Sequence, residues 1–193
     1  MGSNIEIEAK VLVSKEEYNQ VIKNLHLDTY YKFKQTNYYI DSDEYDIKKN
    51  GFALRVREKN QEFELTLKTP LSEGLLEKNE NISWQVFEDL RDNNIFPEGG
   101  IKNFLLILGI DVSKLKIITS LTTERIRIDY KNENVVVDKS IYNGQVDYEL
   151  EAESTSMDNA RELLRKVLEE SGVKEFQYNT ISKQARALNS LSK

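Results

Sequence analysis

Two stretches of the chain carry the same alternating pattern: EIEAK at Glu6–Lys10 and ELEAE at Glu149–Glu153. Successive side chains of a β-strand point to opposite faces, so Glu6, Glu8 and Lys10 are predicted to share one face. The apolar residues between them face the other way, and the second stretch repeats this arrangement. Clustered carboxylates repel one another, and hard divalent cations are their usual partners. The two stretches therefore predict carboxylates that converge on a metal ion.

Length and composition favour one globular domain over residues 1–193 with a substantial hydrophobic core. The net charge of −6 argues against a general nucleic-acid surface, because contacts with phosphates dominate that affinity. The sequence shows neither a charged-then-apolar leader nor an apolar run of about 18 residues, so we expect a cytoplasmic protein without membrane contact. The absence of cysteine excludes disulfides and thiolate metal sites. The oligomeric state is not indicated.

Hydrophobic periodicity predicts the remaining helices and strands. Ser14 and Glu17 form a capping box before a helix over 15–27, and the only histidine, His26, is expected to have a surface role near its end. Turn residues at 60–61 and 143–144 join neighbouring strands. Further strands are predicted at 34–41, 52–57, 63–68, 117–121, 124–130 and 135–138, and further helices at 84–90, 101–108 and 180–191, with another that Gly172 ends.

The charged strand faces allow two interpretations. The simpler one turns them to water, as half-buried strands usually do. However, the apolar stripes of the predicted helices need apolar strand faces to pack on, which leaves the charged faces to line the interior of a closing sheet. The charges are also segregated by sign, whereas a solvated face intersperses them. An interior of this kind suits a polyanion with a metal ion, and its cations come from the middle strands: Arg55, Arg57, Lys68, Arg125 and Arg127.

These motifs resemble the CYTH domain family, or triphosphate tunnel metalloenzymes, and within it the small bacterial YjbK-like branch. The resemblance runs over nearly the whole chain. It implies an α+β fold in which an eight-stranded antiparallel β-barrel forms a tunnel with a charged interior, and helices pack on the outside. The motifs that carry it are, in order, the ExExK of Glu6, Glu8 and Lys10, then Tyr38, Tyr39 and Asp41, Leu54–Arg57, Leu65–Lys68, Arg125, and Glu149, Glu151 and Glu153.

The resemblance also implies roles for individual residues. Paired glutamates hold Mg²⁺ or Mn²⁺, here Glu6, Glu8, Glu149 and Glu151, while Glu153 continues the same face. Phosphate oxygens are gripped by Lys10, Arg55, Arg57, Lys68, Arg125 and Arg127, and by Lys183 from a helix at one tunnel mouth. The predicted catalytic residues are Glu8, Glu151 and Lys183. A further acidic position falls on Glu77, favoured over Glu80 because it follows Gly74, Leu75 and Leu76, and Asp138 has either a site role or a structural one.

The function predicted from this resemblance is a metal-dependent hydrolase acting on inorganic triphosphate or on a nucleoside or thiamine triphosphate, without a covalent intermediate. Triphosphate hydrolysis requires neutralised phosphate charge and a positioned water, which arginines and a metal ion supply. Three alternatives stay open at this point. The same site could cyclise ATP to cyclic AMP, it could bind polyphosphate or nucleotides without turnover, or the charged surface could serve protein contacts.

Overall fold

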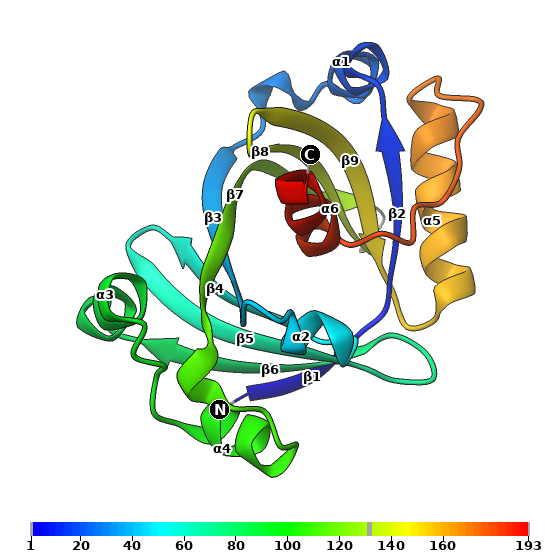
Figure 1. Cartoon of the computed structure of the whole chain (residues 1–193). Helices are drawn as coiled ribbons and strands as arrows, with labels where there is room; N and C mark the ends of the chain where they lie inside the picture. Colours follow the sequence, from blue (N-terminus) through cyan, green and yellow to red (C-terminus); the bar gives the residue numbers. More distant parts are fainter. Residues whose placement is uncertain (1, 131–132, 193) are drawn as a thin grey trace. The chain divides into compact units, whose positions relative to one another are not determined.

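The computed structural model describes residues 2–130 and 133–192. Its contacts group into two compact units. Unit 1 comprises Met1–Ile5, Gln35–Leu121 and Lys183–Lys193, and unit 2 comprises Glu6–Lys34 and Thr122–Ser182. Each unit is described by itself below, with the labels of Figure 1. The single domain over residues 1–193 stays a prediction.

Unit 1 is an antiparallel sheet with helices on its apolar face. Its strands follow the order β1-β6-β5-β4-β3-β7. The turn between β4 and β5 has Asn60 and Gln61 at φ values of 52° and 64°, the left-handed conformation that a tight two-residue hairpin needs. The elements are β1 (Gly2–Glu6), β3 (Lys32–Asp41), α2 (Asp46–Lys49), β4 (Ala53–Lys59), β5 (Glu62–Pro70), β6 (Leu75–Ile82), α3 (Trp84–Asn93), α4 (Gly100–Ile107), η2 (Val112–Lys114), β7 (Lys116–Tyr130), α6 (Lys183–Asn189) and η3 (Ser190–Ser192).

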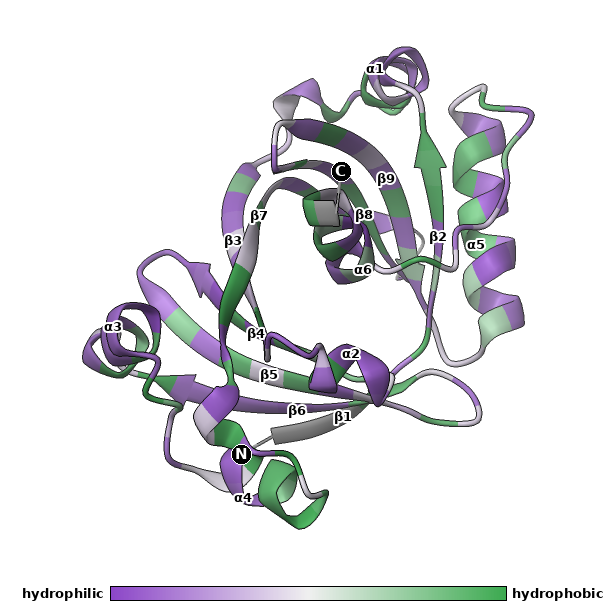
Figure 2. Ribbon diagram, viewed as in Figure 1, coloured by the Kyte–Doolittle hydropathy of each residue, from purple (hydrophilic) through white to green (hydrophobic). Residues whose placement is uncertain are grey.

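The core of unit 1 lies between this sheet and the helices α3 and α4. Hydropathy alternates along β5 (Figure 2), so that Phe63, Leu65 and Leu67 are buried while the residues between them point to the other face. Phe87 of α3 stacks on Phe63 with ring centroids 4.7 Å apart. Burying one such aromatic side chain stabilises the fold by roughly 2–3 kcal/mol. The opposite face of β4 and β5 carries their polar and charged side chains.

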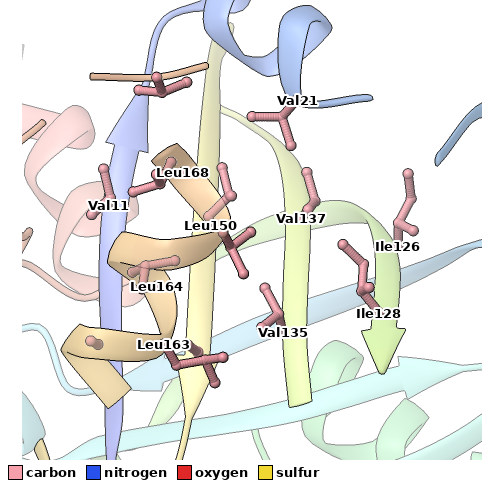
Figure 3. Packing of buried hydrophobic residues seen from close by; sticks show 14 of the residues in the cluster. Val11, Val21, Ile126, Ile128, Val135, Val137, Leu150, Leu163, Leu164 and Leu168 are labelled. Carbon is pink, nitrogen blue, oxygen red and sulfur yellow. The ribbon is translucent and has the colours of Figure 1, made fainter. Parts of the chain in front are cut away.

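Unit 2 is an antiparallel sheet of β7, β8, β9 and β2, in that order. Helix α5 lies along β2 and β9 (Figure 1), and its leucines pack on Val11, Leu150 and the valines of β8 (Figure 3). The predicted capping box at Ser14 and Glu17 is confirmed at the start of α1. The elements are β2 (Glu8–Val13), α1 (Lys15–Asn24), η1 (Leu27–Thr29), the second half of β7, β8 (Glu133–Tyr142), β9 (Gln145–Glu153) and α5 (Met157–Glu170).

Several predicted boundaries are wrong. The strand expected through residues 6–10 is divided, because β1 ends at Glu6 and is a neighbour of β6, whereas β2 begins at Glu8 and pairs with β9. The strands expected at 117–121 and 124–130 form one strand, β7. The helix expected over 15–27 ends at Asn24, and the exposed His26 has a left-handed φ of 53°. In the described part of the chain, no helix is long and apolar enough to cross a membrane.

Candidate functional site

One face of the unit 2 sheet is charged, and strand register brings its residues together. Lys10 of β2 is opposite Glu151 of β9, and Asp138 of β8 lies between Glu149 and Arg125 of its two neighbours. The residues that alternate with them are the apolar core residues of this unit. We call this set the acid-rich face: Glu8, Lys10, Arg125, Arg127, Asp138, Glu149 and Glu151.

Ion pairs hold the cations of the acid-rich face. Lys10 Nζ donates to Glu8 Oε1 at 2.5 Å, and Arg125 Nη2 donates to Glu151 Oε2 at 2.8 Å. Although burial acts to lower it, the pKa of Lys10 is raised by Glu8 and Glu151. Burial likewise opposes the charge of Arg125, yet Asp138 and Glu151 raise the pKa of its guanidinium. Both cations therefore stay charged beside the carboxylates.

The donor set of the acid-rich face fits a hard divalent metal. Its candidate ligands are carboxylate oxygens, which Mg²⁺ and Mn²⁺ prefer, and Glu149 and Glu151 are only 1% and 8% exposed. Glu8 and Glu151 form ion pairs with Lys10 and Arg125, respectively. Accordingly, within residues 2–130 and 133–192 no three His, Cys, Asp or Glu side chains are gathered closely enough to hold a metal ion. The fourth predicted ligand, Glu6, is the last residue of β1.

The polar face of the unit 1 sheet carries mainly cations. Arg55 is opposite Tyr39, and Arg57 is opposite Asn37, whose Oδ1 accepts a hydrogen bond from Arg57 Nε at 3.3 Å. Lys68 is opposite Glu77, and their charged groups lie 3.3 Å apart. We call this set, with the α6 residues described next, the cation-rich face: Tyr39, Arg55, Arg57, Lys68, Glu77, Lys183 and Arg186.

Tyr39 marks the centre of the cation-rich face. Its side chain is buried, which raises the pKa of its phenol, and Arg55, Lys183, Arg57 and Arg186 all lie near enough to act in the opposite direction. The Nε atom of the Arg55 side chain is buried and has no hydrogen-bond partner among the described residues. Four cations therefore lie near one neutral hydroxyl. Crowded like charges of this kind favour a bound anion.

Arg186 was missed by the sequence reasoning. It follows Lys183 by three residues on α6, which places the two on one side of that helix. This spacing was the available signal. Its proximity to Tyr39, by contrast, depends on how the last segment of unit 1 packs against β3, which no local pattern indicates.

The two acidic candidates on β6 have different positions. Glu77 faces the cations, and although burial acts to raise it, Lys68 and Arg55 hold the pKa of Glu77 below its ordinary value. Glu80 lies on the opposite face, where its Oε1 accepts a hydrogen bond from the backbone N–H of Ile101 at 3.0 Å in the first turn of α4. Glu80 thus provides a hydrogen-bond acceptor for a backbone N–H at the N-terminus of α4 that has no partner within the helix. Two other candidates, Arg127 and Glu153, share the acid-rich face by alternation but are exposed.

Comparison with known proteins identifies the family. The CYTH domain model matches residues 4–187 of the chain. The chain belongs to the CYTH domain family. This CYTH protein is 34% identical over 173 residues to YjbK of Bacillus subtilis (strain 168), which carries a provisional triphosphatase name, and the match spans 90% of each chain.

Solved structures share the fold of this CYTH protein. A Bacillus halodurans protein, provisionally named an adenylate cyclase, is 38% identical with a TM-score of 0.88, over 96% of this chain and 98% of its own. A Hippeastrum protein, titled as a provisional adenylyl cyclase with a dominant triphosphatase activity, is 23% identical with a TM-score of 0.77, over 96% of both chains. The predicted family and fold class are confirmed, with nine strands in the described residues in place of eight.

Proposed function

We propose that this CYTH protein is a metal-dependent hydrolase of triphosphate compounds: inorganic triphosphate or a nucleoside or thiamine triphosphate. The observation that carries the proposal is the separation of charge between two polar strand faces, one rich in buried carboxylates and the other in cations. Carboxylates hold a divalent metal and arginines grip phosphate oxygens, and phosphoryl transfer needs both. The family and the YjbK relative support the same reaction class.

The acid-rich face would hold the metal ion through Glu6, Glu8, Glu149 and Glu151. When bound, Mg²⁺ or Mn²⁺ supplies positive charge at phosphate oxygens and polarises phosphorus. Among these ligands Glu8 and Glu151 are the proposed catalytic carboxylates, because each already lies against a phosphate-binding cation. The negative charge of Glu8 and Glu151 also raises the pKa of Lys10, which favours the protonated form that phosphate oxygens require.

The cations bind the substrate. Planar guanidinium groups donate paired hydrogen bonds to phosphate oxygens, which Lys side chains supplement as point charges. Water is proposed to add to the terminal phosphorus and to lose a proton to solvent, while the bond from that phosphorus to the bridging oxygen breaks. The diphosphate portion leaves with this oxygen, to which Lys183 donates a hydrogen bond. The assignment of both faces to one substrate rests on the family resemblance. The proposed binding residues are Lys10, Arg55, Arg57, Lys68, Arg125, Arg127 and Lys183.

Product analysis tests the proposal. Purified protein with Mg²⁺ or Mn²⁺ is expected to release orthophosphate from inorganic triphosphate, ATP or thiamine triphosphate, and EDTA is expected to stop it. A cyclase would instead convert ATP to cyclic AMP and pyrophosphate, an outcome that the provisional name of the Bacillus halodurans relative makes worth measuring. Binding of these compounds without any product would indicate a binding module. The cytoplasmic location and the absence of nucleic-acid binding stay predictions, which cell fractionation and gel-shift assays would check.

A further inference from the structure

Asp138 forms the most complete ion pair of the acid-rich face. Arg125 Nε donates to Asp138 Oδ1 at 2.7 Å, and Arg125 Nη2 donates to Asp138 Oδ2 at 2.6 Å. Asp138 is 0% exposed and lies directly opposite Arg125 in the register of β7 and β8. A bidentate, buried pair of this kind fixes the plane of the guanidinium as well as its position.

The remaining nitrogen of Arg125 is left for another partner. A guanidinium has donors on Nε, Nη1 and Nη2, and the first and last of these are bonded to Asp138. Nη2 also donates to Glu151. Arg125 Nη1 has no hydrogen bond to any residue that the structure describes, and its side chain keeps 15% exposure. The pair with Asp138 thus leaves Nη1 as the guanidinium nitrogen that can donate to a ligand.

We propose that Asp138 is a positioning residue, which holds Arg125 so that its Nη1 donates to a phosphate oxygen while Glu151 serves the metal ion. The proposal rests on the proposed function and goes beyond it, because it assigns Asp138 the role of holding a substrate-binding residue. Glu151 has only one bond to Arg125 and can exchange it for a metal ion without releasing the arginine. Asp138 has both carboxylate oxygens occupied, and its departure would leave a buried guanidinium with one acceptor.

A double-mutant cycle on tripolyphosphate binding tests this role. By calorimetry with saturating Mn²⁺, Asp138→Asn is expected to weaken binding about tenfold, the loss typical of an outer partner of a binding group. In an Arg125→Gln background the same substitution is expected to have no further effect. Mn²⁺ affinity without phosphate, measured by electron paramagnetic resonance, is expected to stay unchanged. The matched control is Asp129→Asn, an exposed aspartate on the same strand as Arg125. An additive loss, or weaker Mn²⁺ binding by Asp138→Asn, would overturn the proposal.

A second measurement uses the wild-type protein and does not depend on the folding of a variant. In ¹⁵N-arginine NMR, the Arg125 Nε–H signal, assigned by its absence in Arg125→Lys, is expected to exchange slowly with water. It is expected to keep that protection when Mg²⁺ is added, because Asp138 stays on Arg125. Loss of protection on addition of Mg²⁺ would mean that Asp138 moves to the metal, contrary to the proposal. Wild-type protein that binds tripolyphosphate without turnover would overturn the proposed hydrolase only, since the cycle and the spectrum decide the role of Asp138.

Discussion

The acid-rich face of unit 2 and the cation-rich face of unit 1 are built by the same strand alternation but are balanced differently. On the acid-rich face, Lys10 and Arg125 are each bonded to a carboxylate. On the cation-rich face, the Nε atom of Arg55 has no hydrogen-bond partner within the described residues, and the neighbouring Tyr39 is neutral. Carboxylates of the first face are candidate ligands of a metal ion, whereas the positive charge of the second face favours binding of an anion.

The difference shows where a ligand contributes most to stability. A buried donor without a hydrogen-bond partner, such as Arg55 Nε, destabilises the native state, and an anion that binds only the native state offsets this cost. Tripolyphosphate is thus expected to stabilise unit 1 through Arg55 and its neighbours. A metal ion on the acid-rich face must instead compete with ion pairs that already exist.

The largest expected effect is on metal binding at the acid-rich face. Glu151→Gln keeps the shape of the side chain and removes its charge, so Mn²⁺ affinity is expected to fall at least about 100-fold. This exceeds the usual loss when a residue that only hydrogen-bonds to a metal ligand is changed. Electron paramagnetic resonance of Mn²⁺ measures this. The exposed Glu133→Gln on β8 is the matched control. Equal Mn²⁺ affinities for wild type and Glu151→Gln would remove Glu151 from the metal site.

The next effect concerns Glu77, the acid of the cation-rich face that pairs with Lys68. Glu77→Gln breaks its buried pair with Lys68, so the free energy of unfolding at neutral pH is expected to fall by about 2 kcal/mol. The folded pKa of Glu77 lies below its ordinary value of 4.5, so this stability is present above pH 4.5 and is lost as the pH falls through the folded pKa.

Urea titrations at several pH values measure the contribution of Glu77. The difference between wild type and Glu77→Gln is expected to shrink on acidification, whereas Glu62→Gln, an exposed change on β5, should show no such trend. A difference that is the same at neutral and acidic pH would mean that the charge of Glu77 contributes nothing.

A smaller effect is expected for anion binding at the cation-rich face. Arg55→Gln is expected to weaken tripolyphosphate binding about 20-fold, the size of a charged hydrogen bond, and to leave Mn²⁺ affinity unchanged. Calorimetry measures both affinities. Arg91→Gln serves as the control, because Arg91 is an exposed arginine of α3 bonded to Asp92. If Arg55→Gln instead changed Mn²⁺ affinity alone, the assignment of the two faces would be reversed.

The smallest effect is expected for Arg186, which sequence reasoning did not select. Arg186→Gln is expected to weaken tripolyphosphate binding about fivefold, because it removes one of four cations around Tyr39. Combining it with Arg55→Gln shows whether the two act on one ligand. A combined loss equal to the product of the single losses indicates independent contacts, and no loss from Arg186→Gln would exclude it from the site.

Local alternation explains how much of this molecule could be predicted. The period of two along β4, β5, β8 and β9 separates ionic from apolar residues whatever the strands pair with, so both faces were predictable. The interruption between β1 and β2 at Ile7 was not predictable, because it depends on which strands β1 and β2 pair with. The same holds for the bond between Arg125 and Asp138, which strand register creates, and for Arg186, which reaches Tyr39 through tertiary packing. The roles of the site residues stay predictions.

The most direct test of the central claim is a ³¹P NMR time course of inorganic triphosphate with wild-type protein, with and without Mg²⁺. With Mg²⁺ only, we expect the triphosphate signals to disappear and equal amounts of pyrophosphate and orthophosphate to appear. Arg55→Gln and Glu151→Gln should both be slower, the first recovering at high substrate concentration and the second not. In a parallel sample the protein is incubated with Mn²⁺, which is removed before the spectrum is recorded. Triphosphate signals that stay unchanged with both metal ions would contradict the claim that the two faces serve triphosphate hydrolysis.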